Sequence, residues 1–159
     1  MKGKSAVAVS VLLCLAVAWI VCPVPLSRAG EVPPEIGAVI DYDGMKKYPQ
    51  DAGARDDYVA QQKAAYLQVR DYHDPEVPPQ VLACVREKAA QGFPANYTAQ
   101  KFFIDTQVRD WRYLRVYSMP SVPVGEIERV KKEAATEFPD DFSTQKLIVE
   151  TKVEAIIHQ

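Results

Sequence analysis

The residues in this chain that could carry chemistry are few and widely spaced. Two adjacent carboxylate pairs, Asp56-Asp57 and Asp140-Asp141, have the side chains that a hydrolase or a calcium site would use. Each pair is expected where a helix begins, and carboxylates there are favoured by capping and by the helix dipole alone. The sequence contains no EF-hand loop, HExxH, GxSxG or phosphate-binding glycine loop. We therefore expect capping residues at these positions and no catalytic residue.

Cysteine and histidine chemistry is equally restricted. Two of the three cysteines fall in the N-terminal 29 residues, which leaves Cys84 alone in the rest of the chain. A lone cysteine on a helix usually fills a small apolar space, and pairing between two molecules is the alternative. Only His73 and His158 could offer imidazole, and there is no CxxCH motif. We expect no zinc site, no haem and no other cofactor.

The segment 109–117 interleaves basic and aromatic residues near the end of a predicted helix, and it is the candidate interaction surface. Its side chains could stack on a glycan or a peptide. The structural alternative places Trp111 in the core, pairs two tyrosines at i, i+4 and puts arginines near a helix C-terminus, where cations are favoured. The candidate residues are Arg109, Arg112, Tyr113 and Tyr117.

The N-terminus has the order of a secretory signal peptide. A basic start is followed by the segment 5–27, which contains no charged residue. Small residues at Ser27 and Ala29 predict cleavage before Gly30. The alternative is an uncleaved membrane anchor, since the apolar run approaches the roughly 20 residues that span a bilayer. We expect residues 1–29 to be a signal peptide and the mature chain to be periplasmic or secreted.

The charge of the mature chain limits its partners. Removing Lys2, Lys4 and Arg28 with the leader changes the formal net charge from −2 to −5. An acidic chain of this kind is a poor partner for nucleic acid. We expect contact with a membrane only through the N-terminal segment, if that segment is retained.

An internal repeat organises the mature chain. Residues 77–111 align with residues 122–156 at a constant offset of 45, and eleven of the 35 positions are identical. A weaker first copy begins at Val32, also at an offset of 45. After Pro49 we interpret residues 50–57 as a loop with a six-residue excess, which shifts the offset to 39. This alignment matches Gln61 with Gln100 and Gln145.

Each copy has the pattern of a helix, a turn and a second helix. The first helices follow a Val-Pro pair, and the turns carry an aromatic-proline pair followed by Asp or Asn, as in Phe93 to Asn96 and Phe138 to Asp141. We expect the repeated glutamines to bond to the adjacent turn or to a neighbouring helix. Gly37 and Gly44 weaken the leading helix of the first copy, which we expect to be partly irregular.

The second and third copies carry the pattern aromatic-Pro-x-Asp/Asn-aromatic-x-x-Gln followed by an amphipathic segment, and the first copy departs from it. The instances are 138–145 and 93–100. This pattern resembles tandem helical-hairpin segments of short bacterial proteins of unassigned function. The resemblance implies a fold and brings no activity or site residues with it.

The sequence thus predicts an all-α protein with three tandem helix-turn-helix hairpins, stacked as a short solenoid or a bundle, in a single domain over residues 30–159. The repeat units are about 32–73, 77–117 and 122–157. We interpret the chain as an exported helical-repeat protein of the cell envelope that binds a protein or another envelope component and is not an enzyme. The alternative is a periplasmic protein that binds a small ligand or processes a substrate.

Overall fold

The computed structural model describes residues 30–158 as six α-helices, with no β-strand in that range. The helices are α1 (Pro34–Lys47), α2 (Ala52–Arg70), α3 (Pro79–Gly92), α4 (Tyr97–Val116), α5 (Val124–Glu137) and α6 (Phe142–Ile157). The all-α prediction is confirmed, while the predicted signal peptide lies outside the described residues. None of the helices in this range is long and apolar enough to cross a membrane.

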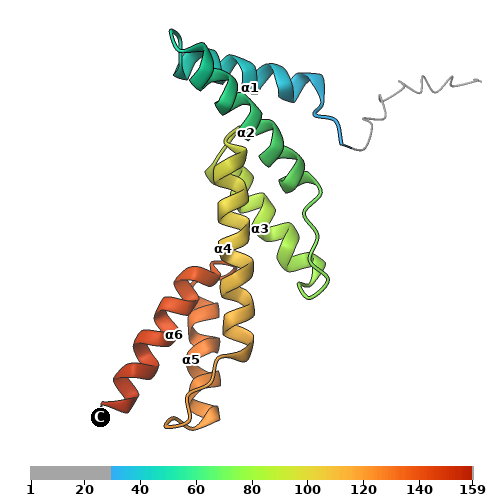
Figure 1. Ribbon diagram of the computed structural model, residues 1–159. Coiled ribbons are helices and arrows are strands. Elements are labelled where there is room, and N and C mark those ends of the chain that lie inside the picture. The colour runs from blue at the N-terminus through green and yellow to red at the C-terminus, as the bar shows by residue number, and fades with distance from the viewer. Residues whose placement is uncertain (1–29, 159) are drawn as a thin grey trace, which may run out of the picture.

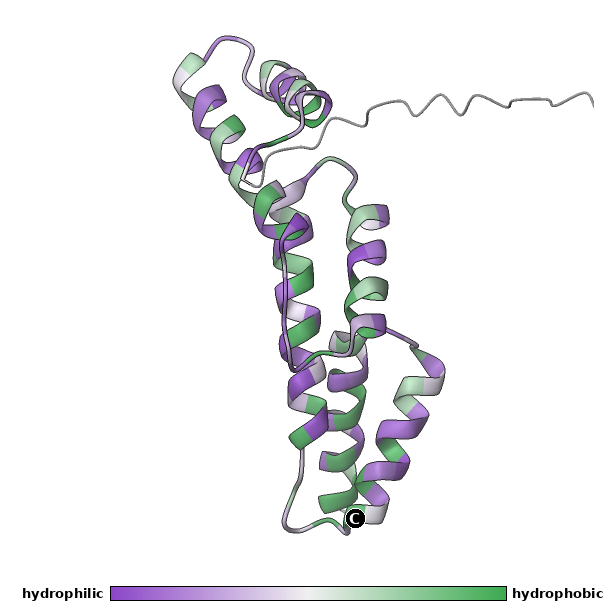
Figure 2. Cartoon of the chain, turned by 90° about the vertical axis from the view of Figure 1, so that its right-hand side faces the viewer, coloured by the Kyte–Doolittle hydropathy of each residue, from purple (hydrophilic) through white to green (hydrophobic). Residues whose placement is uncertain are grey.

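The six helices form an elongated array (Figure 1). Within the array α1 packs on α2, α3 on α4 and α5 on α6. The even-numbered helices also pack on one another, α2 on α4 and α4 on α6. These three helices therefore form a continuous column, called the spine below. Apolar and polar bands alternate along the helices in Figure 2, as amphipathic helices covered on one side require.

The turn inside each helix pair is built from the aromatic-proline motif, as predicted. Phe93 ends α3 and donates its backbone N–H to the Ala89 carbonyl, and Phe138 does the same to Ala134 at the end of α5. The N-cap of the following helix is Asn96 for α4 and Asp141 for α6, and each side chain accepts a backbone N–H at 3.2 Å. These contacts satisfy donors that a helix start leaves unpaired.

The first helix pair follows the same 45-residue period without a shift, so the predicted loop at 50–57 is wrong. Tyr48 ends α1, and Asp51 caps α2 by accepting the Ala54 N–H at 2.9 Å. Residues 52–57 are already the first turns of α2. Asp51 therefore corresponds to Asn96 and Asp141, because a cap must directly precede its helix.

Two further expectations for the first copy change with this register. Asp56 and Asp57 lie inside α2 and do not cap it, and Gln61 is exposed while its neighbour Gln62 is buried. The leading helix α1 is also continuous from Pro34 to Lys47 and not partly irregular. Packing against α2 compensates for the weak helix propensity of its glycines.

The core is made of small clusters within and between the helix pairs. Ile40, Val85 and Val130 occupy equivalent positions of α1, α3 and α5 and are 0–1% exposed. One cluster surrounds Val85 and extends to Phe142 of the next pair, and another surrounds Val130. In the described part of the chain these two clusters contain seven and six buried residues, and the first joins two helix pairs, so contacts between pairs contribute to stability.

Gly44 and Gly37 offer a matched test of how closely α1 and α2 approach. A Cβ at Gly44 would lie 2.8 Å from Cγ2 of Val59, whereas a Cβ at Gly37 would have its nearest neighbour 4.0 Å away. We expect Gly44→Ala to lower the free energy of unfolding by about 1–2 kcal/mol through overpacking. Gly37→Ala should raise it by up to about 1 kcal/mol, because alanine is the better helix former. Urea unfolding followed by circular dichroism measures both, and equal effects would contradict the close contact.

Candidate functional site

Three exposed residues run along one side of α4 at a spacing of seven. They are Phe102, Arg109 and Val116, and seven residues make almost two helical turns. The exposed fractions are 73% for Phe102, 78% for Val116 and 68% for the side chain of Arg109. We call these residues the α4 stripe. Two large apolar side chains with a cation between them thus lie open to solvent on the middle helix of the spine.

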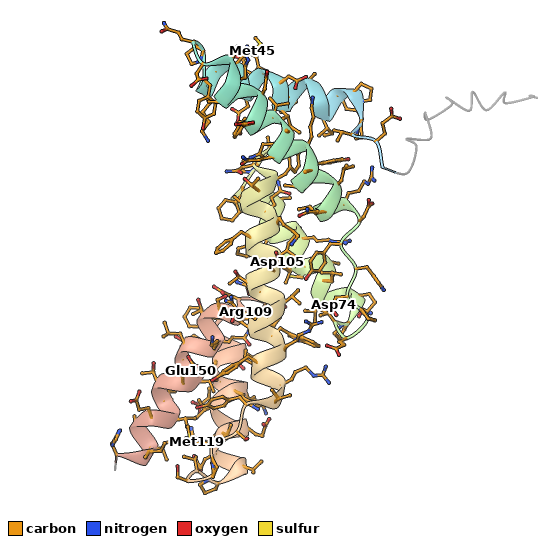
Figure 3. The ribbon with its side chains drawn as sticks, in the orientation of Figure 1. Met45, Asp74, Asp105, Arg109, Met119 and Glu150 are labelled. Atoms are coloured by element: carbon orange, nitrogen blue, oxygen red, sulfur yellow. The ribbon has the colours of Figure 1, made fainter. Side chains whose placement is uncertain are left out.

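A surface groove of about 860 Å³ lies beside the stripe. Figure 3 shows Asp105 and Arg109 on α4 and Asp74 on the segment that joins α2 to α3. The groove, called the α4 groove below, brings together three of the four candidate residues, and Tyr117 is not part of its lining. Its lining residues are Tyr72, Glu76, Asp105, Val108, Arg109, Arg112, Tyr113, Arg115 and Val116.

Arg112 fixes one wall of the α4 groove. Its guanidinium donates to Asp74 at 2.6 Å and contacts Glu76 at 3.1 Å. Asp74 is only 9% exposed and also accepts the backbone N–H of Glu76 at 3.1 Å. Arg112 therefore holds the connection between α2 and α3 against α4, and its charge is already compensated.

Tyr113 and Tyr117 pack towards α6. Their ring centroids are 5.4 Å apart, and the Lys146 ammonium lies 4.7 Å from the Tyr113 ring. Burial and a hydrogen bond to Glu150 raise the pKa of Tyr113 to about 12. These contacts match the structural alternative for the tyrosine pair, and Trp111 likewise packs against the core cluster around Val85.

Arg109 is the candidate residue whose charged group is most open to a ligand. Its Nε donates to Asp110 at 3.2 Å, and the rest of the side chain is exposed. Arg115 lies 4.8 Å from the Trp111 ring and also borders the groove. The site can therefore offer cations, tyrosine edges and the apolar ends of the α4 stripe to a partner.

The carboxylate pairs, the cysteine and the histidines named in the sequence analysis do not line the α4 groove. Asp141 is a helix cap, and His73 and His158 are exposed. Burial, followed by a hydrogen bond with Asp140, raises the pKa of the Cys84 thiol, which makes it a weaker nucleophile at neutral pH. In residues 30–158 no group of three or more His, Cys, Asp or Glu side chains is placed to hold a metal ion.

Two buried glutamines at the junctions of the spine escaped the sequence analysis. The Gln62 side-chain carbonyl accepts the Tyr97 N–H at 2.7 Å, and that of Gln107 accepts the Phe142 N–H at 2.7 Å. In each case the acceptor lies on one spine helix and the donor is the backbone N–H of the first residue of the next spine helix. An ungapped offset of 45 would have aligned Gln62 with Gln107 in place of Gln61 with Gln100.

The other repeated glutamines behave as predicted. Gln100 donates to the Phe93 carbonyl at 2.8 Å, and Gln145 donates to the Phe138 carbonyl at 2.7 Å. Each ties the start of a spine helix to the turn that precedes it. These buried amides are bonded within the protein, as buried polar groups require.

Asp110 should make the stability of the junction between α4 and α6 depend on pH. The carboxylate is 3% exposed, accepts the Ser143 hydroxyl at 2.8 Å and lies 3.5 Å from the Lys146 ammonium. Burial alone would raise its pKa, but the hydrogen bonds from Arg109 and Ser143, with Lys146 nearby, outweigh burial and hold the pKa below its usual range.

We expect the free energy of unfolding to fall as the solution is acidified from about pH 4, the ordinary value for aspartate, through the lower folded pKa of Asp110. Stability falls on acidification because the folded state binds a proton at Asp110 less readily than the unfolded chain does. Asp110→Asn should reduce stability at pH 7 and weaken this acid dependence. Urea midpoints between pH 7 and pH 2 measure it, with the exposed Asp57→Asn as the control. An unchanged acid slope would show that Asp110 is not responsible.

Comparisons with protein-family models, with curated proteins and with solved structures found no match to this chain.

Proposed function

We propose that the mature chain is an exported helical-repeat binding module of the cell envelope, with no catalytic activity of its own. Its three tandem hairpins would be α1–α2, α3–α4 and α5–α6, stacked as a short solenoid. The 45-residue period, the repeated turns and the packing along the spine support this proposal. Arrays of this kind present extended surfaces to partners.

The α4 stripe carries the proposal of a binding role. Single large apolar side chains scattered over a protein surface are common and need no functional explanation. Phe102 and Val116, however, lie on one side of one helix with Arg109 midway between them, and Arg109 and Val116 also line the α4 groove. A protein or another envelope component with apolar groups and an anionic group between them fits this pattern. Nucleic acid does not fit the net charge of −5 that remains after the predicted cleavage.

A pull-down from envelope fractions with purified protein as bait tests the binding role. We expect a partner that is retained by the parent protein and by Val124→Ser, which changes an equally exposed side chain on α5. The same partner should be lost with Phe102→Ser and with Arg109→Glu. A partner retained by all four proteins, or none at all, would count against the α4 stripe.

The proposed export is inferred from the N-terminal segment 1–29, and a separate experiment tests it. We expect the protein purified from the envelope to have the intact mass of a chain beginning at Gly30. Its location would be periplasmic or secreted. A mass that includes Met1, together with membrane association, would favour the anchor.

The α4 groove also supports the second candidate function, a periplasmic protein that binds or processes a small ligand. Its volume of about 860 Å³ is in the range of small-molecule sites, and Arg109 and Arg115 border it. A small-molecule extract that raises the melting temperature of the parent protein but not of Arg109→Glu would favour this function over a macromolecular partner.

A further inference from the structure

A second surface pocket lies where α5 and the start of α6 meet the end of α4 (Figure 1). Its volume is about 390 Å³, and we call it the α5 pocket. Arg115 borders both this pocket and the α4 groove. Apolar and charged side chains line the pocket together, among them Trp111, Leu114, Arg115, Glu128, Lys131 and Lys132.

The α5 pocket is positively charged in an acidic chain. Three cations and one carboxylate give its lining a formal charge of +2, whereas the whole chain has −2. Lys131 donates to Glu128 at 2.8 Å, so one of the cations is compensated. Arg115 and Lys132 form no ion pair within residues 30–158. These two cations are therefore available to an anion.

The equivalent arginine one repeat earlier is compensated. Arg70 lies 45 residues before Arg115, and its guanidinium is paired with Asp71 at 2.7 Å. The position of this aspartate is taken by Val116 in the later copy, so Arg115 lacks the corresponding partner. The Arg115 guanidinium lies instead 4.8 Å from the Trp111 ring. A contact of this kind holds a cation in place without neutralising it.

The other uncompensated cation of the α5 pocket replaces an acid. Lys132 lies at the position of Glu87, which accepts from the Gln91 side-chain amide at 3.1 Å. The helices α3 and α5 have the same length, and each packs on the helix that follows it. A helix pair therefore folds in this way with either charge at this position, and packing does not explain the positive charge of the α5 pocket.

Apolar side chains lie beside the cations in the α5 pocket. Trp111 and Leu114 are half-buried, and Phe142, which also lines the pocket, is buried. An inorganic ion would contact only the cations, whereas an organic anion can also bury a ring against these side chains. The volume of the pocket is within the range of small-molecule sites, about 300–1,000 Å³.

We propose that the α5 pocket binds a small organic anion in which a carboxylate or phosphate group is attached to an apolar ring. Arg115 and Lys132 pair with the anionic group, and the ring packs against Trp111 and Leu114. The site depends neither on export nor on the α4 stripe, because Lys132 lines the α5 pocket and not the α4 groove. Binding weakens as salt is added, since both cations are exposed.

The indole N–H resonance of Trp111 reports binding in the α5 pocket directly. Trp19 is the only other tryptophan of the chain, so Trp19→Phe leaves a single indole signal in the ¹H–¹⁵N spectrum whether or not the leader is removed. The probes are benzoate, phenyl phosphate, inorganic phosphate and benzamide, the neutral analogue of benzoate. We expect a saturable shift with benzoate or phenyl phosphate, and the tighter of the two identifies the anionic group.

Three outcomes of this titration overturn the proposal. The first is the absence of a saturable shift with both organic anions. The second is benzamide binding as tightly as benzoate, because the cations would then contribute nothing. The third is inorganic phosphate binding as tightly as phenyl phosphate, because the apolar side chains would then contribute nothing.

Charge variants in the Trp19→Phe background locate the anion. Lys132→Glu gives α5 the charge that α3 has at this position, and Arg115→Gln removes the other uncompensated cation. We expect each to weaken binding of the tighter anion about tenfold, as the loss of one charge-assisted contact does. The matched control is Lys46→Glu, at an exposed lysine of α1 that forms no ion pair within the described residues. It should change the affinity by less than about twofold.

Arg109→Glu separates the α5 pocket from the α4 groove, because Arg109 lines only the groove. We expect this variant to bind the anion as the parent does, even if the α4 stripe has lost its partner in the pull-down. Binding that is lost in Arg109→Glu and kept in Lys132→Glu would place the anion in the α4 groove and overturn the proposal. Equal weakening in Lys132→Glu and Lys46→Glu would reduce the effect to net charge and overturn it as well.

Discussion

Gln62→Leu is expected to lower the free energy of unfolding by about 2–3 kcal/mol, whereas the neighbouring Gln61→Leu should change it by no more than about 0.5 kcal/mol. Gln62 is 2% exposed, and its carbonyl accepts the N–H of Tyr97 at 2.7 Å. Tyr97 is the first residue of α4, so its N–H has no partner inside the helix. Leucine fills a similar volume but leaves this part-buried donor unpaired.

The amide nitrogen of Gln62 adds a second contact, since it donates to the Thr98 hydroxyl at 2.9 Å. Gln62→Glu keeps the acceptor and loses this donor, so we expect it to cost less than Gln62→Leu. Urea unfolding at neutral pH measures all three variants. If Gln61→Leu proved as costly as Gln62→Leu, the 45-residue register of the first helix pair would be wrong.

Val149→Ala should be the other strongly destabilising change, by about 1–4 kcal/mol through lost burial and the cavity that remains. Val149 is 0% exposed in the cluster around Val130. Lys152 lies on α6 outside that cluster and makes a partly exposed ion pair with Glu133 at 3.2 Å. We expect Lys152→Ala to remain within about 0.5 kcal/mol, as exposed ion pairs contribute little.

Ile156→Ala gives the graded comparison along the same helix. Ile156 is partly buried and packs against the same cluster, but it lies in the last turn of α6, where helices fray. Its cost should therefore lie between those of Val149→Ala and Lys152→Ala. Urea melts of the three variants decide the order, and a Lys152→Ala effect as large as that of Val149→Ala would contradict the assigned face of α6.

Local residue chemistry was sufficient to predict the helices and the turns of the last two pairs. Proline fixes the backbone at a helix start, and the residue before a proline avoids the helical conformation. Phe93-Pro94 and Phe138-Pro139 therefore end α3 and α5 wherever the helices pack. Asn96 and Asp141 cap the next helices for an equally local reason.

The first pair shows where local reasoning failed. Gly53 and the polar residues around it are typical of a loop, yet they begin α2, because burial of Ala65 and packing on α1 and α4 stabilise a long helix. The same packing keeps α1 helical through Gly44, whose missing side chain allows the close contact with Val59. Such contacts join residues distant in sequence, and propensity does not report them.

For the candidate site, too, one part could be predicted from the sequence and the other depended on the tertiary structure. The sequence by itself determined which residue types are available, including the arginine and tyrosine run that lies on α4. Only the tertiary structure decided that Arg112 is committed to Asp74 and that Tyr113 packs towards α6, leaving Arg109 exposed between Phe102 and Val116. A polar side chain can bind a partner only if its hydrogen-bonding groups are not already paired within the protein. The fold determines which groups lie close enough to pair with it.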